Sequence, residues 1–204
     1  MASGTAVRDR EALCQALTRV VAEHGWVGAT PDRVAREARV HPPEFYDHFR
    51  SLEACYLAVY DRMLGRVSRT ALRLVAARTR PPGVDAWQEQ LDAIFSGLLL
   101  FFSLEPALAR TCLVEVLSAG PAARARREAA LDDFARYVES LRLSNGEPMP
   151  PLAAELIALG TTDLLYRRVA RGETEQLPTL LPELRQLWLT TVEQHTDAPV
   201  AATT

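Results

Sequence analysis

The sequence contains no lysine: all 23 basic residues are arginine, set against 26 acidic residues in a chain of 204. The formal net charge of −3 excludes a protein that binds polyanions through bulk positive charge alone. Arginine is well suited to phosphate recognition, but a codon bias toward GC-rich DNA produces the same choice. The missing lysine therefore says little about function.

Cysteine is also scarce. Cys14, Cys55 and Cys112 are far apart in the sequence, with no Cys-x-x-Cys pair and no histidine beside them. This spacing argues against a disulfide framework and against a structural zinc site. We therefore expect no metal and no cofactor, and we expect the three thiols to act as small apolar residues on helix faces.

Long apolar runs are missing too. The longest nearly uninterrupted stretch, Ile94–Phe102, is too short to span a bilayer. The first residues, Met-Ala-Ser-Gly-Thr-Ala-Val-Arg-Asp-Arg-Glu, become charged where a secretion signal has its apolar core. We therefore expect a cytoplasmic protein without a membrane partner.

No segment alternates apolar and polar residues as a strand does, whereas apolar spacings of three and four recur throughout. The pattern predicts an all-α chain of about nine helices. The first is expected over about 7–24 with Gly25 as its stop, two short helices follow, and a long helix starts near Leu52. Later helices are expected at about 84–103, 106–118, 122–143, 151–171 and 182–195.

These elements divide the chain into four parts. We expect a three-helix helix-turn-helix domain over residues 1–52, a connecting helix over 53–80, an apolar helical bundle over 81–195 and a disordered tail over 196–204.

The two short helices that follow the first helix carry the strongest motif. Thr30-Pro31-Asp32 supplies a helix cap, a proline at the first helical position and an acid at the positive helix end. Two short helices, joined by a tight turn and braced by an earlier helix, place a recognition helix in the major groove of DNA. The segments Thr30–His41 (TPDRVAREARVH), Phe45–Phe49 (FYDHF) and Glu53-Ala54 resemble the N-terminal domain of the tetracycline-repressor (TetR) family.

This resemblance implies an all-helical, homodimeric transcription factor, usually a repressor, with a C-terminal ligand-binding and dimerisation domain. Its partners would be double-stranded DNA with a palindromic operator, a second copy of the chain and an unidentified small-molecule effector. By position, the implied DNA-binding residues are Thr30, Arg39, Pro42, Pro43, Tyr46, Asp47 and His48.

Within that set, Thr30, Tyr46 and His48 would touch phosphates, and the prolines and Asp47 would face base edges. Arg39 stands where the family usually has a glycine. It must therefore accept a left-handed backbone conformation, at a cost of about 1 kcal/mol, if the turn geometry is kept.

The charges of this helix-turn-helix domain, called the head below, are compatible with two functions. Residues 31–50 carry four arginines and four acids, so the head has no local excess of positive charge. Two of those acids, Glu44 and Asp47, fall on the reading helix, and Leu52 replaces a customary phosphate-binding lysine. The chain is either a ligand-responsive DNA-binding regulator or a TetR-fold interaction module with weakened or lost DNA binding.

An enzyme is not expected. His41, Glu44 and His48 form the single candidate constellation, but no third convincing metal ligand, Ser-His-acid arrangement or Gly-rich phosphate loop completes a site.

Three arginines, Arg66, Arg69 and Arg73, share one face of the long helix. They either support the DNA-binding face or form a solvated face that pairs with acids of neighbouring helices. We expect the second arrangement, because the run lies several turns beyond the reading head.

The apolar body holds the candidate effector pocket. Aromatic side chains and a few polar groups inside a helical bundle suit an apolar or amphipathic ligand. The pocket candidates are Trp87, Phe95, Phe102, Cys112, Glu115 and Tyr137. Glu115 lies within an apolar run, so it faces solvent, pairs with an arginine or meets a ligand cation, and pairing is our expectation.

The last two helices are rich in leucine and hold the candidate dimer interface. Two such helices from each subunit would form an isologous four-helix contact, as in the family. The candidate residues are Leu156, Gly160, Leu164, Leu184, Leu187 and Trp188.

Overall fold

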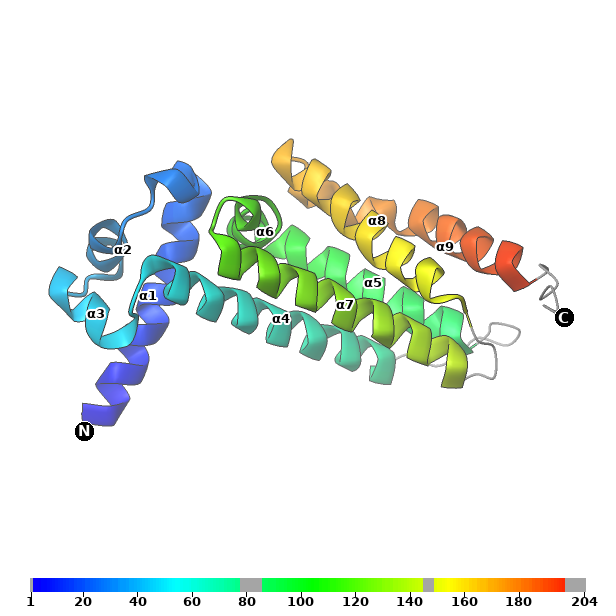
Figure 1. Cartoon of the computed structure of the whole chain (residues 1–204), viewed down its shortest axis with the longest axis horizontal. Coiled ribbons are helices and arrows are strands. Elements are labelled where there is room, and N and C mark those ends of the chain that lie inside the picture. The colour runs from blue at the N-terminus through cyan, green and yellow to red at the C-terminus, as the bar shows by residue number, and fades with distance from the viewer. Residues whose placement is uncertain (1, 78–85, 145–148, 197–204) are drawn as a thin grey trace, which may run out of the picture.

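The computed structural model describes residues 2–77, 86–144 and 149–196, and all regular structure in these ranges is helical. A small head lies at one end and a body of longer helices extends from it (Figure 1). The head consists of α1 (Ala2–Gly28), α2 (Pro31–Ala38), the 3-10 turn η1 (Pro42–Glu44) and α3 (Phe45–His48).

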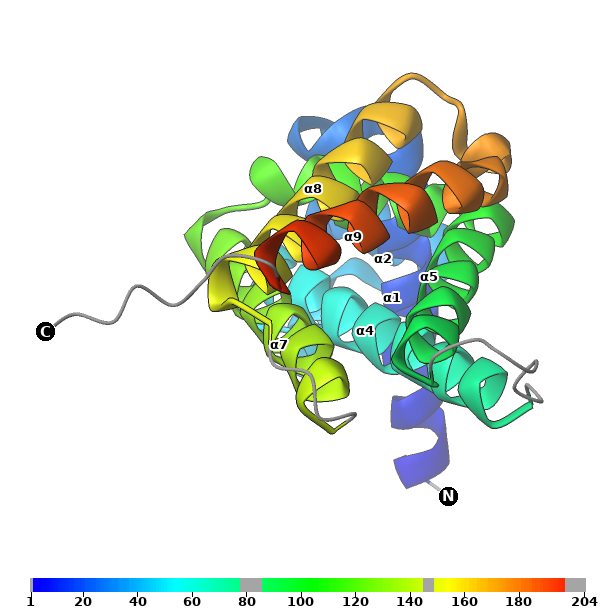
Figure 2. The same cartoon turned by 90° about the vertical axis from the view of Figure 1, so that its right-hand side faces the viewer.

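The body begins with α4 (Leu52–Ala77), which runs out from the head, and it contains α5 (Ala86–Leu104), α6 (Pro106–Ala109), the π turn η2 (Arg110–Val114), the 3-10 turn η3 (Glu115–Leu117), α7 (Pro121–Ser144), α8 (Pro151–Ala170), the 3-10 segment η4 (Thr174–Leu180) and α9 (Leu181–Thr196). Viewed along the body, α4 lies between α5 and α7, and the neighbouring α8 and α9 cross above them (Figure 2).

The predicted all-α architecture is confirmed, and several predicted helix breaks recur in the structure. Gly25 interrupts α1 with a φ of 69°, a conformation that glycine adopts without strain. Helices also separate at Glu105-Pro106 and at Gly120-Pro121. The first helix starts earlier than predicted, at Ala2, and resumes for one short turn after Gly25.

The prediction of a single helix over 106–118 is wrong, because hydrogen bonding changes from α6 to η2 and η3. The Glu115 N–H bonds to the Arg110 carbonyl, five residues back, instead of the Thr111 carbonyl. The Thr111 carbonyl then accepts a hydrogen bond from the Tyr56 hydroxyl at 3.0 Å. The π turn therefore frees a backbone acceptor for a buried side chain of α4.

The segment η4 was not predicted, because it contains Pro178 and 3-10 turns do not follow the 3.6-residue period. Thr196, the first residue of the predicted tail, is the last residue of α9. The rest of that tail, 197–204, and the end of the predicted connecting helix, 78–80, lie outside the described residues.

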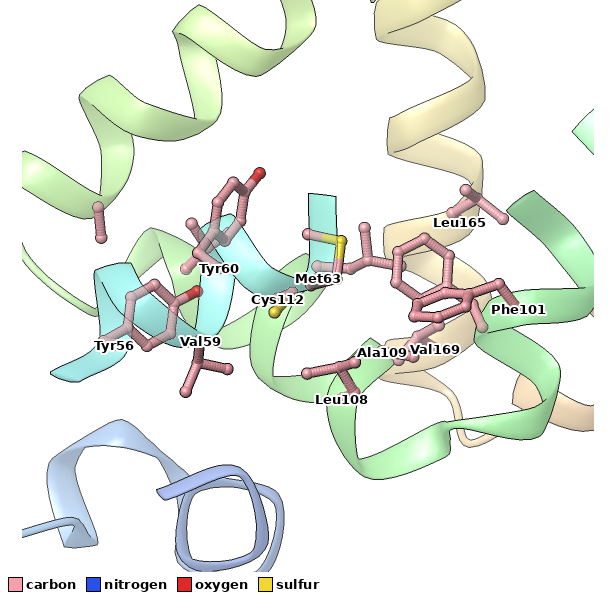
Figure 3. Packing of buried hydrophobic residues seen from close by; sticks show 14 of the residues in the cluster. Tyr56, Val59, Tyr60, Met63, Phe101, Leu108, Ala109, Cys112, Leu165 and Val169 are labelled. Atoms are coloured by element: carbon pink, nitrogen blue, oxygen red, sulfur yellow. The ribbon is translucent and has the colours of Figure 1, made fainter. Parts of the chain in front are cut away.

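One continuous core joins the head to the body. It includes Leu13 and Leu17 of α1 and Phe45 of α3, all fully buried, and it continues into the body. Figure 3 shows its middle part, where side chains of α4 pack against the 106–117 segment and α8. Burial raises the pKa of Tyr60 to about 12 and raises that of Tyr56 further, so both phenols stay neutral in this core.

Within the described residues, no single helix is long and apolar enough to cross a membrane. Taken together, α5 and residues 106–117 have the length and composition of a membrane span, but the two segments meet at a bend of 106°.

Candidate nucleic-acid interface and ligand-binding body

The head holds its second helix in the manner that the sequence predicted. Thr30 has an extended backbone, and its hydroxyl accepts a hydrogen bond from the Arg33 N–H at 3.2 Å. Pro31 follows at the first helical position, and Asp32 lies in the first turn. This cap satisfies a backbone donor that the helix leaves unpaired and keeps Thr30 on the exposed surface.

The turn between α2 and α3 places Arg39 in the left-handed region, with φ 59° and ψ 35°. Its N–H bonds back to the Ala35 and Arg36 carbonyls, and the Val40 N–H bonds to the Ala35 carbonyl at 2.9 Å. A helix that ends with a left-handed residue in this way usually has glycine at that position. The predicted strain at Arg39 is therefore present, and its guanidinium group is exposed.

The reading segment 42–48 consists of η1 and α3. Tyr46 is 58% exposed, and its ring packs edge-on against the buried Phe45. Asp47 is also exposed. Of the other predicted DNA-binding residues, Pro43 is exposed, and Pro42 and His48 are half-buried. Glu44 and Asp47 have no ion-pair partner among the described residues, so two acidic charges stand on this surface.

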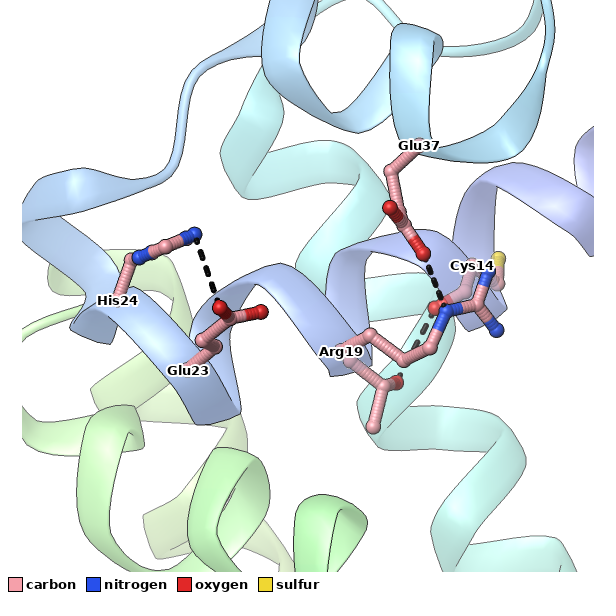
Figure 4. A network of polar contacts seen from close by, with 6 residues as sticks. Cys14, Arg19, Glu23, His24 and Glu37 are labelled. Carbon is pink, nitrogen blue, oxygen red and sulfur yellow. Dashed lines mark hydrogen bonds and ion pairs between the residues drawn. The ribbon is translucent and has the colours of Figure 1, made fainter.

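Two arginines of α1 hold the helix-turn-helix in place. The Arg10 guanidinium lies 4.2 Å from the centre of the Phe49 ring and donates a hydrogen bond to the His48 carbonyl at 2.8 Å. Arg19 donates to Glu37 of α2 at 2.7 Å (Figure 4). α1 therefore fixes both helices that follow it, and Arg19 neutralises one of the acids of the head.

The basic face of α4 is partly paired. Arg62 forms an ion pair with Glu11 of α1, and Arg66 forms one with Glu105 in front of α6. Of the predicted run Arg66, Arg69 and Arg73, the Arg66 contact is the expected pairing with an acid of a neighbouring segment. Both ion pairs lie where the head meets the body.

Two carboxylates make contacts at the end of the body next to the head, and the first of them joins the body to the head. The Glu115 carboxylate accepts a hydrogen bond from the Trp26 N–H at 2.9 Å and pairs with Arg110 at 3.5 Å. The expected pairing of Glu115 with an arginine is thus present. At the start of α4, the Glu53 carboxylate accepts a hydrogen bond from the Ala122 N–H at 3.0 Å, which caps the beginning of α7.

Gly120 makes this second contact feasible. It has a φ of 110°, and a Cβ atom there would collide with the Glu53 carboxylate. The absence of a side chain lets Glu53 reach the first turn of α7.

The candidate pocket residues of the body are mostly packed in its core. Trp87, Phe95, Phe102 and Cys112 are buried, whereas Tyr137 is 39% exposed. The rings of Phe95 and Trp188 stack with their centres 3.5 Å apart, and Phe134 meets Phe95 edge-on. Burial raises the pKa of the Cys112 thiol, which keeps it neutral.

Trp87 combines a buried ring with an unused donor. The Arg142 guanidinium lies 4.4 Å from the centre of its ring. The Trp87 indole N–H has no acceptor among the described residues. This corner of the body therefore holds polar groups beside an aromatic wall.

Two cavities lie at the junction of head and body, and neither was predicted from the sequence. One has a volume of about 440 Å³ and is lined by residues of α1, α6, η2, α8, η4 and the loop before η4, among them Ala22, Ala107, Arg110, Val169 and Glu173. The other, of about 370 Å³, lies between α1, α4 and α6, and we call it the α1–α4 cavity. Their walls come from segments far apart in the chain, so no local pattern marks them.

The candidate dimer residues divide into two groups. Leu184 and Trp188 are buried inside the single chain, and Leu164 packs partly buried against the core. Leu156, Leu187 and their neighbours Leu152 and Leu159 are each at least 49% exposed. Gly160 is exposed, and a Cβ atom built there meets nothing within 4 Å. We call the exposed set Leu152, Leu156, Leu159 and Leu187 the α8–α9 patch.

No group of three or more histidine, cysteine, aspartate or glutamate side chains able to hold a metal ion occurs within the described residues.

The strained turn yields a stability prediction. Replacing Arg39 with glycine is expected to raise the free energy of unfolding by about 1 kcal/mol, because glycine adopts the left-handed conformation without a Cβ penalty. Arg36→Gly, on the same helix in ordinary helical geometry, is the matched control and is expected to lower it by about 1 kcal/mol. Urea unfolding followed by circular dichroism measures both. A shift of the same sign in the two variants would contradict the argument.

The family comparison identifies the head. Residues 13–59 match the sequence model described as bacterial regulatory proteins, tetR family. No protein in the curated set matches this sequence.

Solved structures match most of the chain. The fatty acid degradation regulator FadR from Bacillus halodurans superposes with a TM-score of 0.77 at 18% identity, covering 89% of this chain and 94% of that one. FadR from Bacillus subtilis, solved with stearoyl-CoA, gives 0.74 at 16% identity, covering 89% and 98%. A TetR family regulator from Marinobacter aquaeolei VT8 gives 0.67 at 22% identity, covering 94% and 98%. The similarity therefore extends through head and body alike.

Proposed function

We propose that this chain, whose residues 13–59 match the TetR family of bacterial regulatory proteins, binds a palindromic DNA operator as a homodimer. We further propose that a small apolar or amphipathic effector releases it from DNA. The observation that carries the proposal is the exposed reading segment 42–48, held on α1 by Arg10 and Arg19.

The exposed side chains of the head supply the DNA contacts. Thr30 and Tyr46 present hydroxyl groups to phosphates, with His48 beside them, while Pro43 and Asp47 face the major groove. Arg39 contributes the positive charge nearest the turn. The acids Glu44 and Asp47 repel phosphates, so binding relies on base readout at the matching sequence more than on general attraction to DNA.

Homodimerisation is supported by the α8–α9 patch. Four exposed leucines on two helices that pack together, α8 and α9, are typical of an interaction surface. Gly160, in the middle of α8, allows another helix to approach closely. An isologous contact through this patch would set two reading segments about 34–36 Å apart, one turn of DNA.

The effector hypothesis rests on the body. The related FadR from Bacillus subtilis was solved with stearoyl-CoA, and EbrR, a multidrug binding protein of similar fold, was solved with imidazole. In this chain, an effector would enter among Trp87, Phe95 and Phe102 and displace part of the aromatic packing. Its preference for that altered packing would lower the affinity for DNA by the same free energy.

The contacts at the junction would transmit the change. Movement of segment 106–117 shifts Glu115 away from Trp26, and it shifts the Thr111 carbonyl away from Tyr56. Both partners lie in helices that hold the head, so the spacing of the two reading segments changes with the packing of the body.

Titration of the protein with a palindrome from the neighbouring promoter tests DNA binding. We expect Tyr46→Ala to weaken operator binding by about 10- to 100-fold, since it removes a phosphate contact and part of the helix surface. Leu143→Ala, at an exposed residue near the end of α7 and outside the candidate pocket, is the control and is expected to leave binding unchanged. Fluorescence anisotropy at several salt concentrations gives both affinities.

A dimer that binds no sequence above random DNA at low salt would overturn this function. That result would favour the alternative, a TetR-fold interaction module, which the exposed Glu44 and Asp47 and the missing lysine at Leu52 also suit.

A further inference from the structure

One acid of the head lies on the outermost face of α3. Phe45 is fully buried and holds α3 on the core. Asp47, two residues later, lies roughly 200° around the helix from Phe45, so it points away from the core. Asp47 is exposed, as is Pro43 one turn earlier. Neither side chain is long, so this face of α3 can approach the floor of a DNA groove closely.

The neighbours of Asp47 lie on the flanks of this face. By the same helical spacing, Tyr46 lies on one side of Asp47, and His48 and Glu44 lie on the other. The walls of a groove are phosphates and its floor is formed by base edges. Side chains on the flanks therefore meet phosphates, and Asp47 is the acid that reaches the bases.

The Asp47 carboxylate is free to accept a hydrogen bond. Both acids of α2 are paired: Glu37 with Arg19 at 2.7 Å. Asp32 lies 4.0 Å from Arg36. Among the described residues, the Asp47 side chain has neither an ion pair nor a hydrogen bond. A ligand of this surface therefore meets an acceptor that no arginine of the head occupies.

The backbone on either side of Asp47 is fixed. The Arg10 guanidinium donates a hydrogen bond to the His48 carbonyl at 2.8 Å and lies 4.2 Å from the centre of the Phe49 ring. The Phe49 N–H bonds to the Phe45 carbonyl at 2.9 Å, and both rings are buried. Asp47 is thus presented by a short helix that is anchored at both ends.

The chemistry of a carboxylate restricts which base Asp47 can contact. An ionised carboxylate only accepts hydrogen bonds. In the major groove, guanine and thymine present no donor, and the adenine amino group lies beside the N7 acceptor, which repels a carboxylate. The N4 amino group of cytosine is the donor that carboxylates pair with. Against another base, Asp47 is a charge removed from water without a partner.

We propose that Asp47 is a specificity-determining residue whose carboxylate accepts a hydrogen bond from the N4 amino group of a cytosine in each half of the operator. This assignment rests on the proposed function, because the contact forms only if the chain binds DNA. It adds the identity of one base pair, a C·G pair whose cytosine faces α3.

Selection of the full-length chain on a library of random duplexes tests the proposal. For the wild type we expect a palindrome with cytosine at one fixed position of each half-site. Replacing that C·G pair in the selected duplex should weaken binding by about 5- to 100-fold. Asp47→Asn should move the preference at this position from cytosine to adenine, because an amide both donates to and accepts from the adenine edge.

Glu44→Gln is the matched control. It also removes one negative charge from the reading segment, so both variants should bind random DNA more tightly than the wild type at low salt. Only Asp47→Asn should change a base preference. Both side chains are exposed and both changes keep their size, so circular dichroism should show an intact fold. The duplex replacements need no variant at all.

Failure of this assignment differs from failure of the proposed function. A selected palindrome in which Asp47→Asn changes no base preference would overturn the assignment and leave operator binding in place. A change of the same preference by Glu44→Gln would also overturn it. A wild-type chain that enriches no sequence would overturn both.

Discussion

Replacing Trp188 with alanine is expected to lower the free energy of unfolding by about 3–5 kcal/mol, the range for a large aromatic side chain removed from a packed core. Trp188 is only 2% exposed, and its indole stacks on Phe95 with ring centres 3.5 Å apart. Phe95 is itself fully buried, so the helices cannot collapse into the space without moving it. Urea unfolding at two protein concentrations measures the loss.

The adjacent Leu187→Ala is the matched control for this loss. Leu187 is 61% exposed, and its truncation is expected to change the free energy of unfolding by less than about 0.5 kcal/mol within one protomer. If the stability lost in Trp188→Ala changed with protein concentration as dimerisation does, Trp188 would belong to the subunit contact and not to the core.

The second large effect is expected on assembly. Leu156→Arg should convert the proposed homodimer to a monomer and weaken operator binding by at least about 100-fold. Leu156 is 53% exposed within the α8–α9 patch, one helical turn before Gly160. In an isologous interface both subunits carry the substitution, so two unpaired charges enter the buried contact. A monomer also contacts only one of the two DNA half-sites, which weakens operator binding.

Sedimentation analysis gives the mass of the variant, and anisotropy gives its DNA affinity. Leu72→Arg is the matched control: Leu72 is 59% exposed on α4, away from the patch, and its variant should stay dimeric. Leu156→Arg at the full dimer mass would show that this patch is not the subunit contact.

Much of the fold could be predicted because local patterns specify it. Thr30 and Pro31 start α2, and Gly25 and Gly120 end or separate helices through conformations that other residues avoid. Arg39 was expected to be left-handed because it stands where the TetR family usually has a glycine, and its φ is indeed positive. The π turn at 110–114 was not predicted, since the Tyr56 hydroxyl that bonds to its freed carbonyl lies more than fifty residues away in the sequence.

The site was harder to predict for a similar reason. Periodicity shows that Leu156 and Trp188 are both apolar positions of apolar helices, and it does not show which of the two points toward the protomer's own core. Glu115 was expected to pair with an arginine, but its second partner, the Trp26 N–H, depends on where Gly25 ends the main part of α1.

That last contact has an optical consequence. Trp26 is half-buried, its ring lies edge-on to Tyr56 at 5.5 Å, and its backbone is tied to the Glu115 carboxylate. Trp87 and Trp188 are sealed in the interior, so their emission reports the body alone. The Trp26 indole is therefore an intrinsic fluorophore at the contact between head and body. When that contact weakens, the exposure of the indole to water and its distance from the Glu115 carboxylate change, and its emission changes with them.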